Sequence, residues 1–239
     1  MHRIDIPQWA IDRALERRGA LHVHENLEPT KTALIVIDLQ NAFMVEDVAV
    51  SYVPTAVAIV GNVNALAAAV RRTGGRVYWI KHTVDDASSR AWSEWLAMMT
   101  PATRQGLIAN LAPGSRGHQL YPTLEVKPED EIVQKYRFSA FVQGSSDLPE
   151  RLRAAGYDTV LIAGTVTNVC CESSARDAMM LNFKTIMVSD ANAARTDVEH
   201  NATLATFYAI FGDVMSTSHL IERLDAAAAL GVVARSAAE

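Results

Sequence analysis

The sequence predicts an α/β protein of the doubly wound, Rossmann-like kind: a three-layer α/β/α arrangement with a mostly parallel sheet of about six strands. Two observations carry this prediction. Short apolar runs rich in branched residues are typical of strands buried on both faces, and they recur at 33–37, 77–80 and 160–163. Amphipathic segments with helical spacing, such as 53–72 and 198–211, separate or follow these runs, so strand and helix alternate along the chain.

The composition is that of an ordinary globular protein with a sizeable core. The chain has 239 residues, of which 49% are hydrophobic and 21% charged, and a formal net charge of -5. Its scattered basic residues argue against nucleic-acid or polybasic membrane binding and favour a small-molecule partner. We expect a cytoplasmic protein that does not span a membrane, because the N-terminus lacks a signal-peptide pattern and no apolar run reaches about 18 residues.

Residues 1–30 form a predicted N-terminal arm, and residues 31–239 form the predicted main domain. The arm is moderately amphipathic, so we expect it to pack on a partner subunit of a homo-oligomer, either a dimer or a tetramer. His22 and His24 would point to one face of an extended segment. Because no third ligand is near in the sequence, a surface segment is favoured over a metal site.

The first strand, helix and strand are expected at 33–37, 53–72 and 76–83, with two glycines ending the helix. This order predicts a right-handed crossover. The first strand ends abruptly at Asp38. A buried carboxylate is costly unless it is paired, so Asp38 has either a structural partner or a chemical role, and we favour the role.

The segment 84–128 is too long for an ordinary connection, so it is either a lid over a site or a helical excursion. It contains Trp92, Trp95, Met98 and Met99, a cluster that is more often part of a core than of a substrate pocket. A strand and Lys135 follow it, so Lys135 ends a strand as Asp38 does. The remaining predicted elements are helix 147–155, strand 158–163, strand 184–189 ending in Asp190, helix 198–211, strand 213–215 and helix 217–230.

Two adjacent thiols, Cys170 and Cys171, lie where a predicted strand gives way to a helix. Gly164 ends the strand, and polar residues from Thr167 onward can cap the helix. Unpaired amides and the positive end of the helix dipole favour a thiolate there, and the same amides can hold an oxyanion. The alternative is a pair of small buried hydrophobes beside a tight turn, and spacing alone leaves both interpretations open.

Asp38, Lys135 and Cys170 are expected to meet, because ligands of doubly wound sheets bind beyond the carboxyl ends of the strands. A thiol beside a carboxylate that can take its proton, with an ammonium stabilising the charged pair, is an activated nucleophile suited to acyl transfer. The alternative is that Asp38 and Lys135 only pair to hold two strand ends together.

Three motifs resemble those of the isochorismatase-like cysteine hydrolases, a family that includes nicotinamidases, N-carbamoylsarcosine amidases and ureidoacrylate amidohydrolases. They are LIVIDLQNAF at 34–43, KYRFSAF at 135–141 and GTVTNVCCESSARDA at 164–178. The resemblance extends from about Thr32 to Leu224, and it implies the isochorismatase-like hydrolase fold.

This resemblance also implies roles for single residues. It makes Asp38, Lys135 and Cys170 an Asp-Lys-Cys catalytic triad. It further implies a cis peptide bond between Thr165 and Val166, and an oxyanion hole formed by the amides of Val166 and Cys170. The family register selects Cys170 as the nucleophile and leaves its neighbour, Cys171, at a position where relatives often have valine.

The departures from the family narrow the expected function. Nicotinamidases carry a metal site built on an Asp-x-His pair and further histidines soon after the first motif, but residues 41–81 contain no histidine, so no metal and no cofactor are expected. True isochorismatases usually lack the cysteine, so Cys170 favours amide, ureido or carbamoyl substrates. The TNVC and RFSAF segments are closest to ureidoacrylate and N-carbamoyl amidohydrolases.

We therefore expect a cysteine-dependent amidohydrolase that cleaves a C–N bond of a small molecule through a thioester and releases ammonia or an amine. The alternatives are a vinyl ether hydrolase that uses Asp38, and a non-catalytic binding domain of the same fold. The expected substrate-binding candidates are Gln40, Phe43, Trp92, Tyr136, Thr167 and Asn168.

Overall fold

A parallel sheet of six strands forms the centre of the molecule, seen here in a computed structural model that describes residues 1–48 and 51–236. Its order is β3-β2-β1-β4-β5-β6, and every neighbouring pair is parallel. The strands are β1 (Thr32–Ile37), β2 (Arg76–His82), β3 (Glu131–Lys135), β4 (Thr159–Thr165), β5 (Lys184–Ala193) and β6 (Asp213–Met215). The predicted doubly wound sheet is confirmed.

The strand order places a topological switch point between β1 and β4. The chain adds β2 and β3 on one side of β1, and then β5 and β6 on the far side of β4. The connection that follows β1 therefore runs towards one edge of the sheet, and the connection that follows β4 runs towards the other edge. In such sheets the ligand crevice lies at the carboxyl ends of the two strands that flank the switch. The carboxyl ends of β1 and β4 are thus the place to look for a site.

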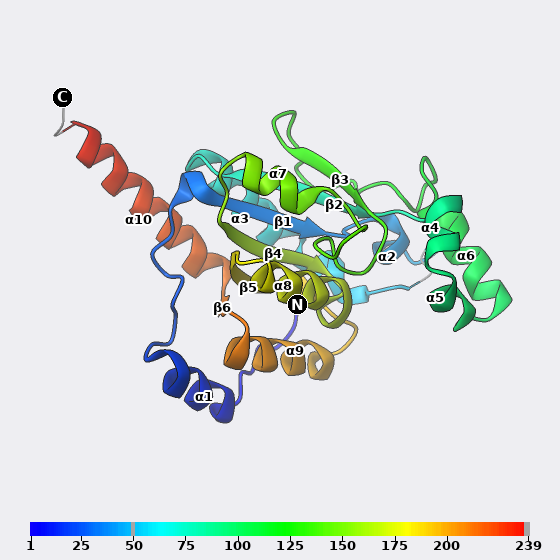
Figure 1. The fold of residues 1–239 in the computed structure, drawn as a ribbon, viewed down its shortest axis with the longest axis horizontal. Coiled ribbons are helices and arrows are strands. Elements are labelled where there is room, and N and C mark those ends of the chain that lie inside the picture. The colour runs from blue at the N-terminus through cyan, green and yellow to red at the C-terminus, as the bar shows by residue number, and fades with distance from the viewer. Residues whose placement is uncertain (49–50, 237–239) are drawn as a thin grey trace.

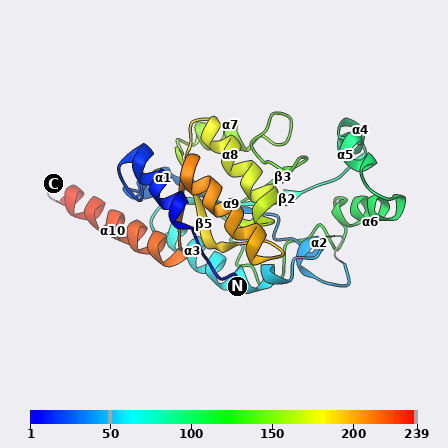
Figure 2. The same ribbon diagram turned by 90° about the horizontal axis from the view of Figure 1, so that it is seen from below.

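Helices cover both faces of the sheet, as the alternating apolar strands require (Figures 1 and 2). One core lies between the sheet and the helices α3 and α10, and the other lies between the sheet and α7, α8 and α9. The bounds are α3 Val60–Arg72, α7 Leu148–Ala154, α8 Glu172–Met180, α9 Asp197–Ile210 and α10 Thr217–Ser236. The distal part of α10 extends away from the sheet at the end opposite to the crevice (Figure 1).

The long segment between β2 and β3 is helical, so the expectation of a helical excursion is confirmed. It contains α4 (Asp86–Ala91), α5 (Ser93–Ala97) and α6 (Pro101–Leu111), gathered beyond the end of the sheet where β1 runs into the short helix α2, Asn41–Met44 (Figure 1). Trp95 and Met99 pack against the core, as expected. Met98 does not, because it is 80% exposed. A role of the segment as a lid stays a prediction.

The predicted helix 53–72 is divided in two. A 3-10 helix, η2 (Pro54–Ile59), precedes α3, and Pro54 lies in its first turn, where its missing N–H costs nothing. Pro54–Arg72 is the one described stretch that is long and apolar enough to cross a membrane by length and composition. Core helices of globular proteins pass the same test, and the inward side chains Val63 and Leu66 are buried against the sheet.

The N-terminal arm contains the helix α1 (Gln8–Arg18), which lies along α9 of the same chain (Figure 2). Ala10 and Ala14 are its buried residues, whereas Trp9 is 50% exposed. The small residues allow close approach to α9, and Ile11 packs against the core, whereas Trp9 and Leu15 remain on the outer side. The buried face of the amphipathic helix therefore packs within the subunit. Packing of the arm on a partner subunit stays a prediction.

Candidate active site

Asp38 stands where β1 ends, and its backbone makes a tight turn. Its φ is 54°, a left-handed conformation that aspartate adopts more readily than most residues. Its amide donates to the carbonyl of Ile80, and its carbonyl accepts from the amide of Gln40. On the other side, Gly164 comes so close that a Cβ there would collide with the carbonyl of Ile37. These backbone contacts hold the buried carboxylate at the switch point.

Lys135 reaches the same place from the end of β3. Its Nζ lies 2.8 Å from Asp38 Oδ2, 3.0 Å from the carbonyl of Arg137 and 3.6 Å from Cys170 Sγ. An ammonium has three protons, and all three have acceptors here. The group is completely buried, and its contacts with Asp38 and Cys170 outweigh that burial and favour the cation over the neutral amine.

Cys170 lies on a π-helical turn, Thr167–Cys171, and the α-helix α8 begins only at Glu172. The polar residues from Thr167 onward indicate only that a helix starts near here. The carbonyl of Val166 accepts from the amides of both Val169 and Cys171, which widens the first turn. The peptide bond between Thr165 and Val166 is cis, in agreement with the family resemblance.

The two thiols lie in different surroundings. Cys170 is 4% exposed and faces Lys135, whereas Cys171 is completely buried in the core beneath α7, α8 and α9. Asp38, Lys135 and Cys170 therefore meet as the strand-end rule predicted, although they are far apart in the sequence.

Burial dominates the electrostatics of the site. It raises the pKa of the Cys170 thiol, and the Asp38 charge adds to this, while Lys135 opposes it. Burial also raises the pKa of Asp38 against the pull of Lys135. Burial alone would lower the pKa of Lys135, but attraction to Asp38 and Cys170 outweighs it and raises that pKa. The sequence pattern of a helix start and a nearby lysine favours a thiolate, whereas burial of Cys170 acts in the opposite direction and favours the protonated thiol.

His82 is a member of the site that the sequence analysis missed. It is the last residue of β2 and pairs in register with Lys135. Its Nε2 is buried and has no hydrogen-bond partner among the described residues. Burial, followed by the charge of Lys135, lowers the pKa of His82 well below its usual value, so the ring is neutral. The rule that selected Asp38 and Lys135, a polar residue at a strand end, would have found it.

Asp38, His82 and Cys170 present an oxygen, a nitrogen and a sulfur atom that lie within 4.8 Å of one another, the one such group of metal-ligand types among the described residues. However, the Lys135 ammonium already bonds to Asp38 Oδ2 and contacts Sγ. A metal ion would have to displace this ammonium or force it to lose a proton. The arrangement therefore favours the ion pair over a bound metal.

Aromatic side chains flank His82. The rings of Trp92, Trp95 and Phe138 lie 6.4, 5.8 and 6.4 Å from the imidazole, measured between centroids. Trp92 stacks on Trp95 at 4.1 Å, and the guanidinium of Arg137 lies over the Trp92 ring. The α4–α5 segment and the chain after β3 thus place a cluster of aromatic rings beside His82.

Five of the six expected substrate-binding residues fall into two groups, and Asn168 stands apart. The inner group has partners within the protein. The amide of Gln40 bonds to the backbone of His82 and His118, Phe43 is in the core, and Thr167 bonds to His200.

Asn168 has a buried Oδ1 without a partner among the described residues. Trp92 and Tyr136 form the outer group and line separate shallow hollows of ≈ 270 Å³ each. Their contacts with substrate stay predictions.

Comparisons with known proteins identify the family of this chain. The isochorismatase domain model matches residues 32–219. The ureidoacrylate amidohydrolase RutB of Pseudomonas syringae pv. syringae (strain B728a) is 32% identical over 226 residues, which cover 89% of this chain and 90% of that protein.

Two solved structures are also similar. A cysteine hydrolase from Pseudomonas syringae pv. phaseolicola 1448A has a TM-score of 0.75 and 31% identity, covering 84% of this chain and 96% of that one. An N-carbamoylsarcosine amidase from Thermoplasma acidophilum has a TM-score of 0.61 and 26% identity, covering 78% and 96%. The matched domain spans the whole sheet and includes Asp38, Lys135 and Cys170, so the chain belongs to the isochorismatase family of hydrolases.

Proposed function

We propose that this protein is a cysteine-dependent amidohydrolase that cleaves a C–N bond of a small amide, ureido or carbamoyl compound through a thioester. One observation carries the proposal: a buried thiol lies beside a buried carboxylate and ammonium at the switch point of the sheet. Asp38 Oδ2 lies 2.8 Å from the Lys135 ammonium, and the carboxylate is close enough to Cys170 for a side-chain hydrogen bond to the thiol. The carboxylate can therefore take the proton of the thiol while it stays paired with the ammonium.

Acylation begins with the thiol of Cys170 attacking the substrate carbonyl carbon while its proton passes to Asp38. A C–S bond forms, and the amides of Val166 and Cys170 hold the oxyanion. Lys135 stays charged and stabilises the developing negative charge on sulfur. The intermediate then collapses: the C–N bond breaks, the proton on Asp38 passes to the leaving nitrogen, and ammonia or an amine departs.

Deacylation reverses the proton movements. A water molecule attacks the thioester carbon and gives a proton to Asp38. The C–S bond breaks, the acid product leaves, and the same proton returns to the thiol. No redox step or cofactor takes part. The resting thiol and the ionised carboxylate are thereby restored.

The relatives support this reaction class, since their names specify a ureidoacrylate amidohydrolase and an N-carbamoylsarcosine amidase. The low exposure of the nucleophile suits a small substrate. Two adjacent free cysteines suit a reducing compartment, so we propose that the enzyme is cytoplasmic. Its proposed partner is its substrate, a small-molecule amide or ureide.

A panel of amides, ureides, carbamoyl acids and vinyl ethers tests the proposal, read by release of ammonia or amine and by chromatography of the acid product. The wild type should hydrolyse a C–N substrate, and acid quenching followed by mass spectrometry should find an acyl group on Cys170. Cys170→Ala should be inactive, with Cys171→Val as the matched control that keeps activity. Hydrolysis of only the vinyl ethers, retained by Cys170→Ala, would instead establish the chemistry of Asp38, and turnover of no compound would favour a binding domain.

A further inference from the structure

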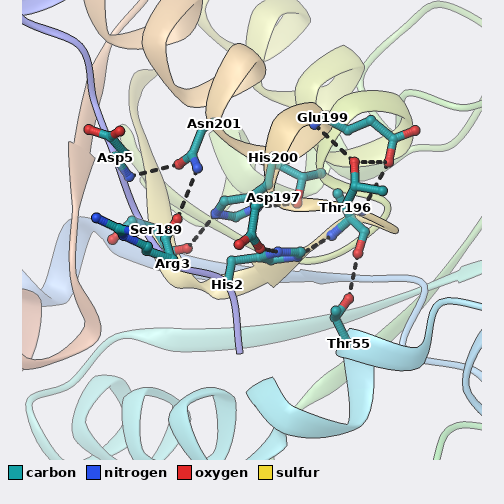
Figure 3. A network of polar contacts seen from close by, with 12 residues as sticks. His2, Arg3, Asp5, Thr55, Ser189, Thr196, Asp197, Glu199, His200 and Asn201 are labelled. Carbon is teal, nitrogen blue, oxygen red and sulfur yellow. Dashed lines mark hydrogen bonds and ion pairs between the residues drawn. The ribbon is translucent and has the colours of Figure 1, made fainter.

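The N-terminal arm is fastened to the body of the protein by a buried histidine, His2 (Figure 3). Its Nε2 accepts a hydrogen bond of 2.9 Å from the amide of Ala194, so the ring proton is on Nδ1. Nδ1 donates to the carboxylate of Asp197 at 2.7 Å. One ring nitrogen is therefore bonded to the connection after β5 and the other to the first residue of α9.

Backbone contacts continue this attachment. The amide of Asp5 donates to Oδ1 of Asn201, and Nδ2 of Asn201 donates to the carbonyl of Arg3, each at 2.9 Å. Residues 2–5 thus lie against the first turns of α9 (Figure 3). Because four hydrogen bonds over four residues fix this stretch, the position of His2 is well defined.

His200 connects the arm to the active site. Its ring stacks on His2, with centroids 4.3 Å apart and planes 17° from parallel. Its Nε2 lies 3.0 Å from the carbonyl of Ser189, so Nε2 carries the proton. Its Nδ1 then accepts from the hydroxyl of Thr167 at 2.9 Å. Burial lowers the pKa of His200 to about 4, which keeps the ring in this neutral form.

Thr167 is the first residue of the turn that carries Cys170. On the other side of the cis bond, Thr165 donates through its hydroxyl to the carbonyl of Ala193 at 3.1 Å. Ala193 directly precedes Ala194, to which His2 is bonded. We call residues 165–170 the oxyanion segment. Two of its hydroxyl groups therefore bond to residues that His2 contacts or that adjoin such a contact: His200 and Ala193.

We propose that the N-terminal arm, through His2, positions the oxyanion segment for catalysis. The inference rests on the proposed function, because that function assigns amides of this segment to the oxyanion. His2 is a positioning residue: it touches neither the thiol nor the carboxylate. It holds the ring of His200, which holds the hydroxyl of Thr167. Without it, we expect the amide of Val166, next to the tied Thr167, to lose its alignment, while the thiol of Cys170 stays in contact with Lys135.

His2→Ala tests this directly. Since removing one oxyanion donor costs about a hundredfold or more, and the arm only aligns the donors, we expect kcat to fall by about tenfold. KM should change little, because no substrate contact is lost. Alkylation of Cys170 by iodoacetamide needs the triad but no oxyanion hole, so its rate should stay at the wild-type value. Asp5→Ala is the matched control, since only the backbone amide of Asp5 makes a contact in the network.

Two further variants separate positioning from general stability. His2→Gln can still accept a hydrogen bond from the amide of Ala194, so it should recover part of kcat. Thr167→Val removes the hydroxyl at the other end of the chain. If both act through one chain of contacts, the double variant His2→Ala with Thr167→Val should be no slower than the slower single variant, whereas independent effects would multiply.

The readouts also separate this inference from the proposed function. Turnover by the wild type tests the proposed function. The role of the arm is tested by the ratio of kcat between each variant and the wild type, and by amide hydrogen exchange of peptides covering 164–172. This exchange should be faster in folded His2→Ala than in wild type or Asp5→Ala. Unchanged exchange, unchanged kcat, or alkylation that falls in parallel with kcat would each overturn the inference.

Discussion

Replacing Lys135 by methionine isolates the contribution of the buried cation, because methionine keeps much of the side-chain length and removes the charge. The ammonium lies 3.6 Å from Cys170 Sγ. At that separation two unit charges in a medium of effective dielectric constant about 20 attract by about 4–5 kcal/mol. Loss of this attraction makes the thiolate roughly a thousandfold harder to form. We expect turnover and alkylation of Cys170 to slow by about two to three orders of magnitude.

The same substitution changes how stability depends on pH. In the wild type, burial raises the pKa of Asp38 and Lys135 opposes that rise. Without Lys135 the pKa rises further above its value in the unfolded chain, so the folded state binds a proton that the unfolded state has already lost. Stability contributed by such a group falls as the pH rises from the unfolded pKa towards the folded pKa. Lys135→Met should therefore lose more stability, relative to wild type, at about pH 8 than at about pH 5.

Mass spectrometry of Cys170 after timed exposure to iodoacetamide measures the first effect, and urea unfolding at the two pH values measures the second. Lys184→Met is the matched control, because its ion pair with Asp158 is largely exposed and contributes little. A folded Lys135→Met protein whose Cys170 reacts as fast as in wild type would refute the assigned role of the cation.

Further variants and treatments test the remaining assignments. Asp38→Asn should remove most turnover while circular dichroism shows a folded protein, and normal turnover would reject Asp38 as the proton acceptor. Cys170→Ala should abolish turnover and Cys171→Val should not, with brief iodoacetamide labelling found on Cys170 first; a label on Cys171 would show that the register is wrong. Exhaustive chelation should leave activity unchanged, and a loss restored by zinc, manganese or iron would contradict metal independence. Light scattering at micromolar concentration should give a dimer or larger oligomer rather than a monomer.

The sequence was sufficient to predict the sheet and its catalytic edge. Strands buried on both faces are read from local apolar runs, and the ends of those runs gave Asp38 and Lys135. Parallel topology then brought distant strand ends together without any knowledge of contacts. The meeting of Asp38, Lys135 and Cys170 follows from these two steps, which is why it could be predicted.

Features that depend on the neighbouring backbone could not be predicted. β5 was expected to end at 189 but continues to Ala193, because its pairing with β4 resumes after an irregularity between Ile162 and Gly164. The π-helical turn before Glu172 likewise depends on the carbonyl of Val166 accepting two amides. These backbone hydrogen bonds depend on how the neighbouring segments are placed. The residue types at these positions do not predict them.

The protonation state of the nucleophile shows the same limit in chemical terms. A helix start and a nearby lysine both favour a thiolate, and both were visible in the sequence. What decides the outcome is desolvation, which comes from elements throughout the chain that close over Cys170. In the proposed reaction, the protonated thiol passes its proton to the carboxylate of Asp38 during attack, and the cation of Lys135 stabilises the sulfur as its negative charge develops. In this scheme the buried ion pair, which is costly to assemble, stabilises a charge that appears in the transition state and is absent at rest.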